Sequence, residues 1–83
     1  MRFSATVSVQ LRGGIADPEG ATIERALPAL GIDAVHAVRA GRSFLFDVEA
    51  ASLEEATVIA QDLASRLLAN PVMEDHDVKV EAK

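Results

Sequence analysis

Nine residues near the amino terminus alternate strictly between apolar and polar side chains, and this pattern restricts the fold more than any other feature of the chain. The apolar set is Phe3, Ala5, Val7, Val9 and Leu11, and the polar set is Ser4, Thr6, Ser8 and Gln10. Successive side chains of a strand point to opposite faces, so the alternation predicts a strand in a sheet with one covered face and one open face.

A chain of 83 residues has room for one domain, residues 1–83. The core of so small a domain contributes little stability, so we expect a partner to add to it.

The most clearly marked helix begins after Ser52. Ser52 and Glu55 stand at the spacing of a capping box, in which the hydroxyl caps forward and the carboxylate reaches back. The apolar residues behind them follow helical spacing: Ala56, Ile59, Ala60, Leu63 and Leu67. We expect Asn70–Pro71 to end this helix.

An earlier helix is predicted from Asp17 to about Leu30. Asp17 can accept hydrogen bonds from the first amides, and Pro18 suits the first helical position. Ile23, Leu27 and Leu30 supply an apolar stripe, and Gly31 followed by Ile32 is typical of a left-handed C-cap. Pro28 removes one hydrogen bond, so we expect a kink or an early loosening there.

Two further segments have strand patterns. Residues 34–49 are predicted to be extended, either as a hairpin turning at Ala40–Arg42, which is slightly favoured, or as one long bent strand. Residues 76–82 alternate and predict a final strand. The order strand, helix, strand or hairpin, helix, strand predicts an α+β fold: a small two-layer ferredoxin-like sandwich, with two helices on one face of an antiparallel sheet.

The composition excludes several classes of function. The net charge of −5 disfavours nucleic acid, because an acidic domain repels a phosphate backbone. The absence of Cys excludes a disulfide framework, a thiolate metal site and a thiol nucleophile, and fits a reducing cytoplasm. No stretch approaches the length of a signal peptide core or a membrane span, so we expect a soluble cytoplasmic protein without a membrane partner.

No catalytic constellation stands out among the polar residues. The hydroxyl residues fall on an open strand face or at caps, where they are commonly structural. His36 and His76 lack the spacing of a zinc helix, and the acidic group Glu74, Asp75 and Asp77 is more typical of a solvated turn than of a cation site. We therefore expect no catalysis by this chain alone.

Other residues suggest contacts with partners. Arg39 and Arg42 flank Gly41, where two guanidiniums can bind a phosphate or a carboxylate, although exposed arginines often serve solubility alone. Apolar side chains are expected in loops or on outward strand positions and are suitable interface material: Ile15, Leu45, Val72 and Met73. An exposed sheet edge can also extend across a two-fold axis.

Three segments together resemble the PurS family, the small subunits of phosphoribosylformylglycinamidine synthase (FGAM synthase). They are Asp17–Gly20 with Ile23, Leu27 and Leu30–Gly31, then Val38–Arg42 leading into Phe46–Val48, and Leu67–Asp75, which is the most specific. The resemblance covers nearly the whole chain. Pro28, Arg42 and His76 depart mildly from the family pattern.

The resemblance implies a non-catalytic subunit, as a homodimer or higher homo-oligomer, in de novo purine biosynthesis. Such a subunit bridges a glutaminase (PurQ), which frees ammonia from glutamine, and an ATP-dependent synthetase (PurL), and it aids ammonia transfer between them. The chain itself then binds no cofactor, while the complex uses ATP, Mg and glutamine. The resemblance places Arg39, Gly41, Arg42, Asn70, Pro71 and Glu74 at contacts within the assembly.

Two other functions share this order of elements. An ACT-like regulatory domain would bind small molecules through the glycine-bearing loops at its strand ends. An acylphosphatase-like hydrolase needs an arginine-bearing phosphate loop and a water-positioning asparagine, and Arg12 and Asn70 lack the required spacing.

Overall fold

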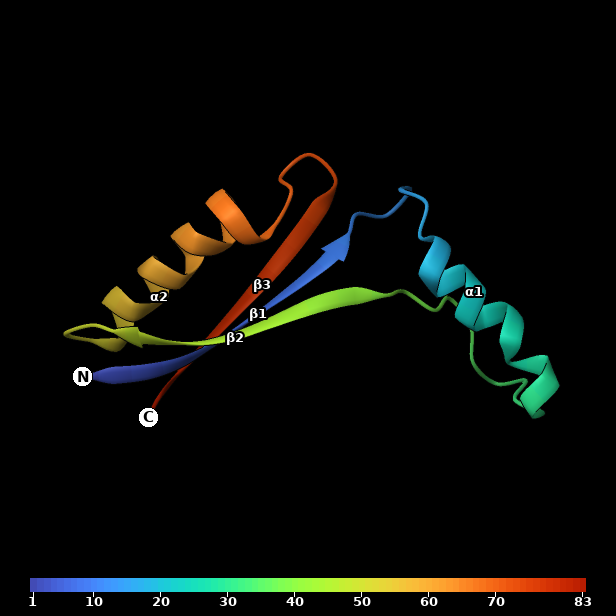
Figure 1. The fold of residues 1–83 in the computed structure, drawn as a ribbon, viewed down its shortest axis with the longest axis horizontal. Coiled ribbons are helices and arrows are strands. Elements are labelled where there is room, and N and C mark those ends of the chain that lie inside the picture. Colours follow the sequence, from blue (N-terminus) through green and yellow to red (C-terminus); the bar gives the residue numbers. More distant parts are fainter.

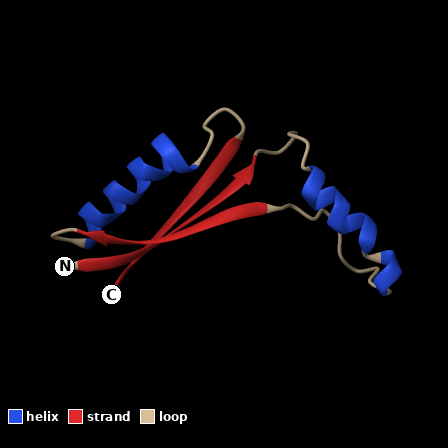
Figure 2. Ribbon diagram, viewed as in Figure 1, coloured by secondary structure: helices blue, strands red, loops and turns tan.

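The computed structural model describes residues 1–83 as a three-stranded antiparallel sheet with two helices (Figures 1 and 2). The strands are β1 (Arg2–Leu11), β2 (Gly41–Glu49) and β3 (Glu74–Ala82), in the order β2-β1-β3. The helices are α1 (Pro18–Ala26), followed by a 3₁₀ turn at Pro28–Leu30, and α2 (Leu53–Leu63), which continues as a π-helical turn over Ala64–Leu68. Neither helix combines the length and apolarity that a membrane crossing requires.

The strand predicted from the alternation at the amino terminus is confirmed as β1, the central strand. Its apolar face is almost fully buried: Phe3, Ala5, Val7 and Val9 are each at most 2% exposed. Across this face lies α2, which presents Ala56, Ala60 and Ala64, all fully buried. Because alanine adds little bulk, the helix axis can approach the sheet closely, and these small side chains pack opposite the larger ones of β1.

Both predicted helix starts are confirmed. The Ser52 hydroxyl accepts from the Glu55 amide at 3.1 Å, and the Asp17 carboxylate accepts from the Gly20 amide at 3.0 Å. The loosening expected at Pro28 is also confirmed, because α1 ends at Ala26 and only a 3₁₀ turn follows. Gly31 has a φ of 74° and forms the predicted left-handed cap, a conformation that glycine adopts without steric cost.

Both alternatives predicted for residues 34–49, the hairpin and the one long bent strand, are wrong. A single strand, β2, begins at Gly41, and residues 31–40 return from α1 without forming a strand. Gly41 pairs with Gln10, and only one further residue, Leu11, remains in β1, so the strand is too short to pair with the residues before Gly41. Their amides are bound elsewhere, since Val38 donates to the Glu24 carboxylate at 2.9 Å and Ala40 to the Asp17 carboxylate at 2.7 Å.

The α+β class with an antiparallel sheet and two helices is confirmed, but the position of α1 differs from the prediction. Only α2 covers the sheet, whereas α1 projects beyond the strand ends, at the right of Figure 1. We call residues 12–40, which run out along α1 and back, the arm. The chain measures 51 × 27 × 14 Å, with a radius of gyration of 16.3 Å against roughly 12 Å for a compact domain of this length. A single chain therefore lacks the second helix of its sandwich.

Candidate functional site

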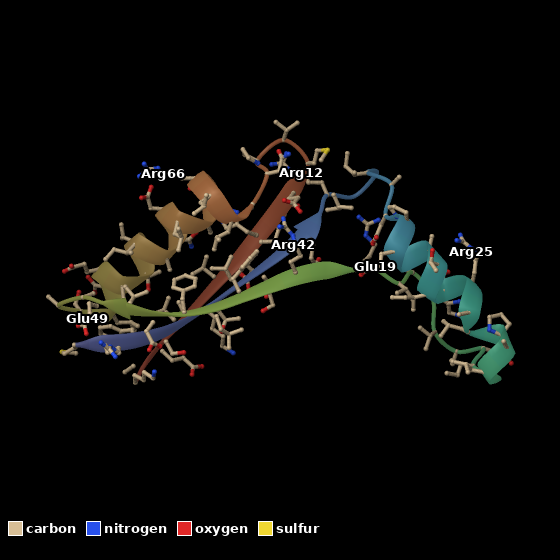
Figure 3. All side chains as sticks on the ribbon, in the orientation of Figure 1. Arg12, Glu19, Arg25, Arg42, Glu49 and Arg66 are labelled. Carbon is tan, nitrogen blue, oxygen red and sulfur yellow. The ribbon has the colours of Figure 1, made fainter.

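The six residues predicted at assembly contacts gather at one end of the sheet, where β1 ends, β2 and β3 begin and the arm departs. We call this region the junction and define it by Asp17, Arg39, Gly41, Arg42, Asn70, Pro71 and Glu74. Figure 3 shows Arg12 and Arg42 near this end, whereas Arg25 lies far out on α1. Two hollows of about 250 and 300 Å³ meet at Glu74, which lines both.

Asp17 and Arg39 hold the base of the arm. The Asp17 side chain is only 6% exposed, and its two oxygens accept from the amides of Gly20 and Ala40. The Arg39 guanidinium lies 3.9 Å from the same carboxylate. The amide hydrogen bond from Gly20 lowers the pKa of Asp17 most, followed by the bond from Ala40 and the charge of Arg39. One carboxylate thus ties the start of α1 to the residue before β2.

Arg39 also binds the loop between β1 and α1. Its terminal nitrogens donate to the carbonyls of Leu11 at 3.0 Å, Arg12 at 3.2 Å and Ile15 at 3.4 Å. The carbonyls of Arg12 and Ile15 belong to a loop with paired glycines, which contribute no side-chain packing to hold it, and Leu11 is the last residue of β1. The guanidinium therefore fixes both chain segments that connect the arm to the sheet.

Arg42 and Glu74 form the second half of the junction and connect β2 with β3. Nη2 of Arg42 donates to both Glu74 oxygens, at 2.8 and 2.9 Å, and Glu74 also accepts from the Asn70 amide at 2.8 Å. The amide bond from Asn70, and then the hydrogen bond from Arg42, lower the pKa of Glu74. The Arg42 guanidinium also stacks 5.6 Å from the centroid of the Phe44 ring.

The turn before β3 completes the junction. The Asn70 side chain accepts from the Val72 amide at 3.0 Å, and Arg12 donates to the Pro71 carbonyl at 2.7 Å. Sequence reasoning identified Asp17 only as a helix cap and missed its bond to Ala40, because the two residues are 23 positions apart. The pairing of Arg42 with Glu74, 32 positions apart, also left no local sequence signal.

These contacts indicate what the junction can do chemically. Asp17 and Glu74 already accept hydrogen bonds from backbone amides, and they form ion pairs with Arg39 and Arg42, so both carboxylates have structural roles within the chain. The residues hold no group of three or more His, Cys, Asp or Glu side chains that could bind a metal ion. The role of the six predicted residues in contacts with another protein stays a prediction.

Apolar side chains lie exposed in three places outside the junction. Leu67, Val72 and Met73 lie near the end of α2 and in the turn that follows it, and they are 74%, 79% and 42% exposed. Leu45 lies on the open face of the sheet. The arm exposes Ile15, Ile23, Leu30, Ile32 and Val35. Exposed apolar groups in such numbers are typical of a protein that docks with others.

Comparisons with known proteins all indicate the same family. A family model described as "PurS: Phosphoribosylformylglycinamidine (FGAM) synthase" matches residues 4–82. The chain is 37% identical over 79 residues to phosphoribosylformylglycinamidine synthase subunit PurS of Methanocaldococcus jannaschii, covering 95% of each chain. It superposes on the PurS subunit of Thermotoga maritima with a TM-score of 0.89 and 36% identity, covering 96% of this chain and 92% of that one. A chain in the structure of PurLQS from Thermotoga maritima gives a TM-score of 0.88 and 36% identity, with 96% and 98% covered.

Proposed function

The chain belongs to the PurS family of FGAM synthase subunits, and from this premise we propose that it bridges the glutaminase (PurQ) and synthetase (PurL) subunits without catalysing a reaction itself. One observation supports this most strongly: the whole chain, rather than a part of it, corresponds to a chain of the PurLQS structure. A match over 96% of one chain and 98% of the other leaves no large insertion that could hold a separate active site.

In this function the chain positions its partners so that ammonia released from glutamine reaches the synthetase before it meets bulk water. Ammonia is a small neutral molecule that becomes ammonium in water near neutral pH, and ammonium is not a nucleophile. The bridge therefore contributes by excluding solvent and fixing distances. Glutamine, ATP and Mg²⁺ are bound by the partner subunits, in keeping with the engagement of Asp17 and Glu74 within this chain.

The distribution of side chains supports docking as the role of this chain. Its charged junction is ordered by internal bonds, and its exposed apolar groups lie at the turn before β3 and along the arm. An ordered polar frame that carries exposed apolar side chains is suited to binding other proteins, because little conformational entropy remains to be lost on association. The same reasoning includes a homodimer, which would cover part of the arm.

Location in the cytoplasm belongs to the same proposal. The chain contains no Cys, so neither its fold nor its contacts depend on an oxidising compartment. Its proposed partners consume ATP and glutamine, which the cytoplasm supplies.

Reconstitution tests the function directly. The chain is mixed with PurL and PurQ from the same organism, and formation of the amidine product is measured with glutamine as nitrogen source and, separately, with a high concentration of ammonium salt. Leaving out the chain is expected to abolish the glutamine-dependent reaction and to leave the ammonium-dependent reaction nearly unchanged. Equal losses with both nitrogen sources, or no loss with either, would contradict the bridging role.

A matched pair of variants locates the docking surface. Val72→Asp places a charge in the turn before β3, and Val58→Asp places one on α2, where the native side chains are 79% and 68% exposed. We expect Val72→Asp to weaken glutamine-dependent activity at least tenfold, because the carboxylate would be buried against a partner. Val58→Asp is expected to stay within twofold of the unmodified chain. The opposite ranking would move the docking surface to α2.

A further inference from the structure

We propose that Arg12 is a positioning residue for docking: its side chain fixes the turn before β3, residues 70–73, in the direction that presents Val72 and Met73 to a partner subunit. This inference deepens the proposed function and rests on it. Arg12 follows directly after β1, and Figure 3 shows its side chain at this turn. In the sequence, Arg12 stood out only as an arginine without the spacing of a phosphate loop.

The turn is held mainly by hydrogen bonds within itself. The Asn70 side chain accepts from the Val72 amide at 3.0 Å, and the Asn70 carbonyl accepts from the Met73 amide at 3.2 Å. Val72 is 79% exposed, and a hollow of about 300 Å³ lies beside Pro71, so packing does not hold the turn against the sheet. The internal bonds keep the shape of the turn, but they do not set its direction relative to the sheet.

Arg12 takes part in every hydrogen bond that joins residues 71–73 to the chain outside residues 70–74. Its Nη2 donates to the Pro71 carbonyl at 2.7 Å, and its amide donates to the Met73 carbonyl at 2.9 Å. Its Nε also lies 3.2 Å from Oδ1 of Asp75, near the start of β3. A turn that is bound at one point can rotate about that point, whereas a second bond prevents the rotation. The side chain of Arg12 supplies this second bond.

The guanidinium projects from a backbone that is itself fixed. The Arg12 carbonyl accepts from the Ile15 amide at 3.1 Å and from Nη2 of Arg39 at 3.2 Å, while its amide is bound to Met73. Because both backbone groups are bound, the remaining freedom of Arg12 lies in its side chain, and the contacts with Pro71 and Asp75 restrict that freedom. The turn is therefore positioned from the end of β1, the central strand.

An ordered turn favours docking, because a mobile turn would lose conformational entropy on binding and so reduce the affinity. The net contribution of one hydrogen bond corresponds to a change of roughly two- to twelvefold in an equilibrium constant. Loss of the Arg12 side chain should therefore raise the chain concentration that gives half-maximal activation of the partners roughly three- to tenfold. The rate at saturation should remain, since the docked complex keeps its other contacts.

A titration tests this role. The chain is added to fixed amounts of PurL and PurQ from the same organism, and glutamine-dependent formation of the amidine is measured at each concentration. Arg12→Gln should raise the half-activating concentration roughly three- to tenfold and leave the maximal rate within about twofold of that of the unmodified chain.

The matched control is Arg2→Gln, at the opposite end of β1. Arg2 forms an ion pair with Glu49 at 3.1 Å, and its side chain is 59% exposed, against 49% for Arg12. The two substitutions remove the same charge and a similarly exposed ion pair, but only Arg12 binds the turn. Exposed ion pairs contribute little to stability, so the control should stay within about twofold in half-activating concentration.

Arg12→Lys separates the charge from the geometry. Lysine keeps the positive charge, but its single nitrogen does not reproduce the separate contacts that Nε and Nη2 make with Asp75 and Pro71. We expect Arg12→Lys to recover only part of the lost affinity. Full recovery of the half-activating concentration would show that the charge alone is sufficient, and would overturn the positioning role.

Hydrogen exchange followed by NMR on the chain alone shows whether the effect is local. In Arg12→Gln the amides of Val72 and Met73 should exchange at least threefold faster than in the unmodified chain, while the amide of Val7 in the middle of β1 should be unchanged. Faster exchange at Val7 to the same extent would indicate a loss of global stability and would contradict a local role in positioning.

The titration distinguishes failure of this inference from failure of the bridging role. If the unmodified chain activates PurL and PurQ, and Arg12→Gln has the same half-activating concentration as Arg2→Gln, the positioning role is wrong and the bridge stands. If the unmodified chain activates its partners at no concentration, the bridge is wrong, and the positioning role is wrong with it.

Discussion

Gly20→Ala offers a sharp test of how the junction holds the arm. In an ordinary helix this substitution stabilises by up to about 1 kcal/mol, because alanine has the better helix propensity. Here the new Cβ would lie 2.5 Å from the Val38 carbonyl oxygen and 2.7 Å from Asp17 Oδ2. Real Cβ atoms essentially never approach so closely, so the backbone at Val38 must move. Overpacking of this kind costs about 1–3 kcal/mol, which outweighs the gain in propensity.

We therefore expect Gly20→Ala to destabilise the fold by up to about 2 kcal/mol, equivalent to a melting temperature up to roughly 16 °C lower for a chain of this size. Differential scanning calorimetry at a fixed protein concentration measures this shift. The matched control is Gly13→Ala, since an added Cβ there meets nothing within 4 Å and the backbone has no positive φ. The control should be neutral or slightly stabilising. A melting temperature for Gly20→Ala at or above that of the unmodified chain would refute the close packing of the arm against the junction.

Three further predictions concern pH, the core and a helix cap. The folded-state pKa values of Asp17 and Glu74 lie below the ordinary values of 3.8 and 4.5. The stability that the two carboxylates contribute is therefore complete above the ordinary values and is lost as pH falls through the lower folded-state values. Urea unfolding followed from about pH 7 to about pH 3 should show this loss of stability, and Glu74→Gln should make the loss shallower. Phe3→Ala should cost about 3–5 kcal/mol in urea unfolding, because the ring is 2% exposed, whereas Leu45→Ala, 74% exposed, should stay within about 0.5 kcal/mol. Ser52→Ala should cost about 1 kcal/mol through loss of its bond to the Glu55 amide, and an unchanged urea midpoint would contradict that role.

The sequence was sufficient to predict the elements that local patterns determine. The alternation of Phe3 to Leu11 predicted β1 and its buried face, because period and burial are linked within one strand. Ser52 and Asp17 marked the starts of both helices, and Pro28 marked the loosening of the first. Each of these features depends on residues within a few positions of one another.

The failures came from contacts between residues far apart in the sequence. The hairpin at residues 34–49 was predicted from a possible tight turn at Ala40–Arg42, yet the amides of Val38 and Ala40 bind carboxylates of the arm instead of a strand. Periodicity also indicated that Ile23 and Leu30 would be buried, but it carries no information about which surface covers them. Within one chain the cover is incomplete, since Ile23 stays 45% and Leu30 71% exposed.

The two arginines predicted at assembly contacts differ in how many of their hydrogen-bond donors remain free to bind a partner. Both terminal nitrogens of Arg39 donate to backbone carbonyls, and its Nε faces Asp17, so every nitrogen of this guanidinium already has a partner within the chain. Arg42 makes all its bonds through Nη2, to Glu74 and to the Leu68 carbonyl, while its side chain is 54% exposed. A guanidinium carries five donors in a fixed plane, so Nε and Nη1 of Arg42 are still able to bind a carboxylate or carbonyl of another protein. Arg39 then acts by positioning the arm, and Arg42 is the residue of the pair suited to direct contact with a partner.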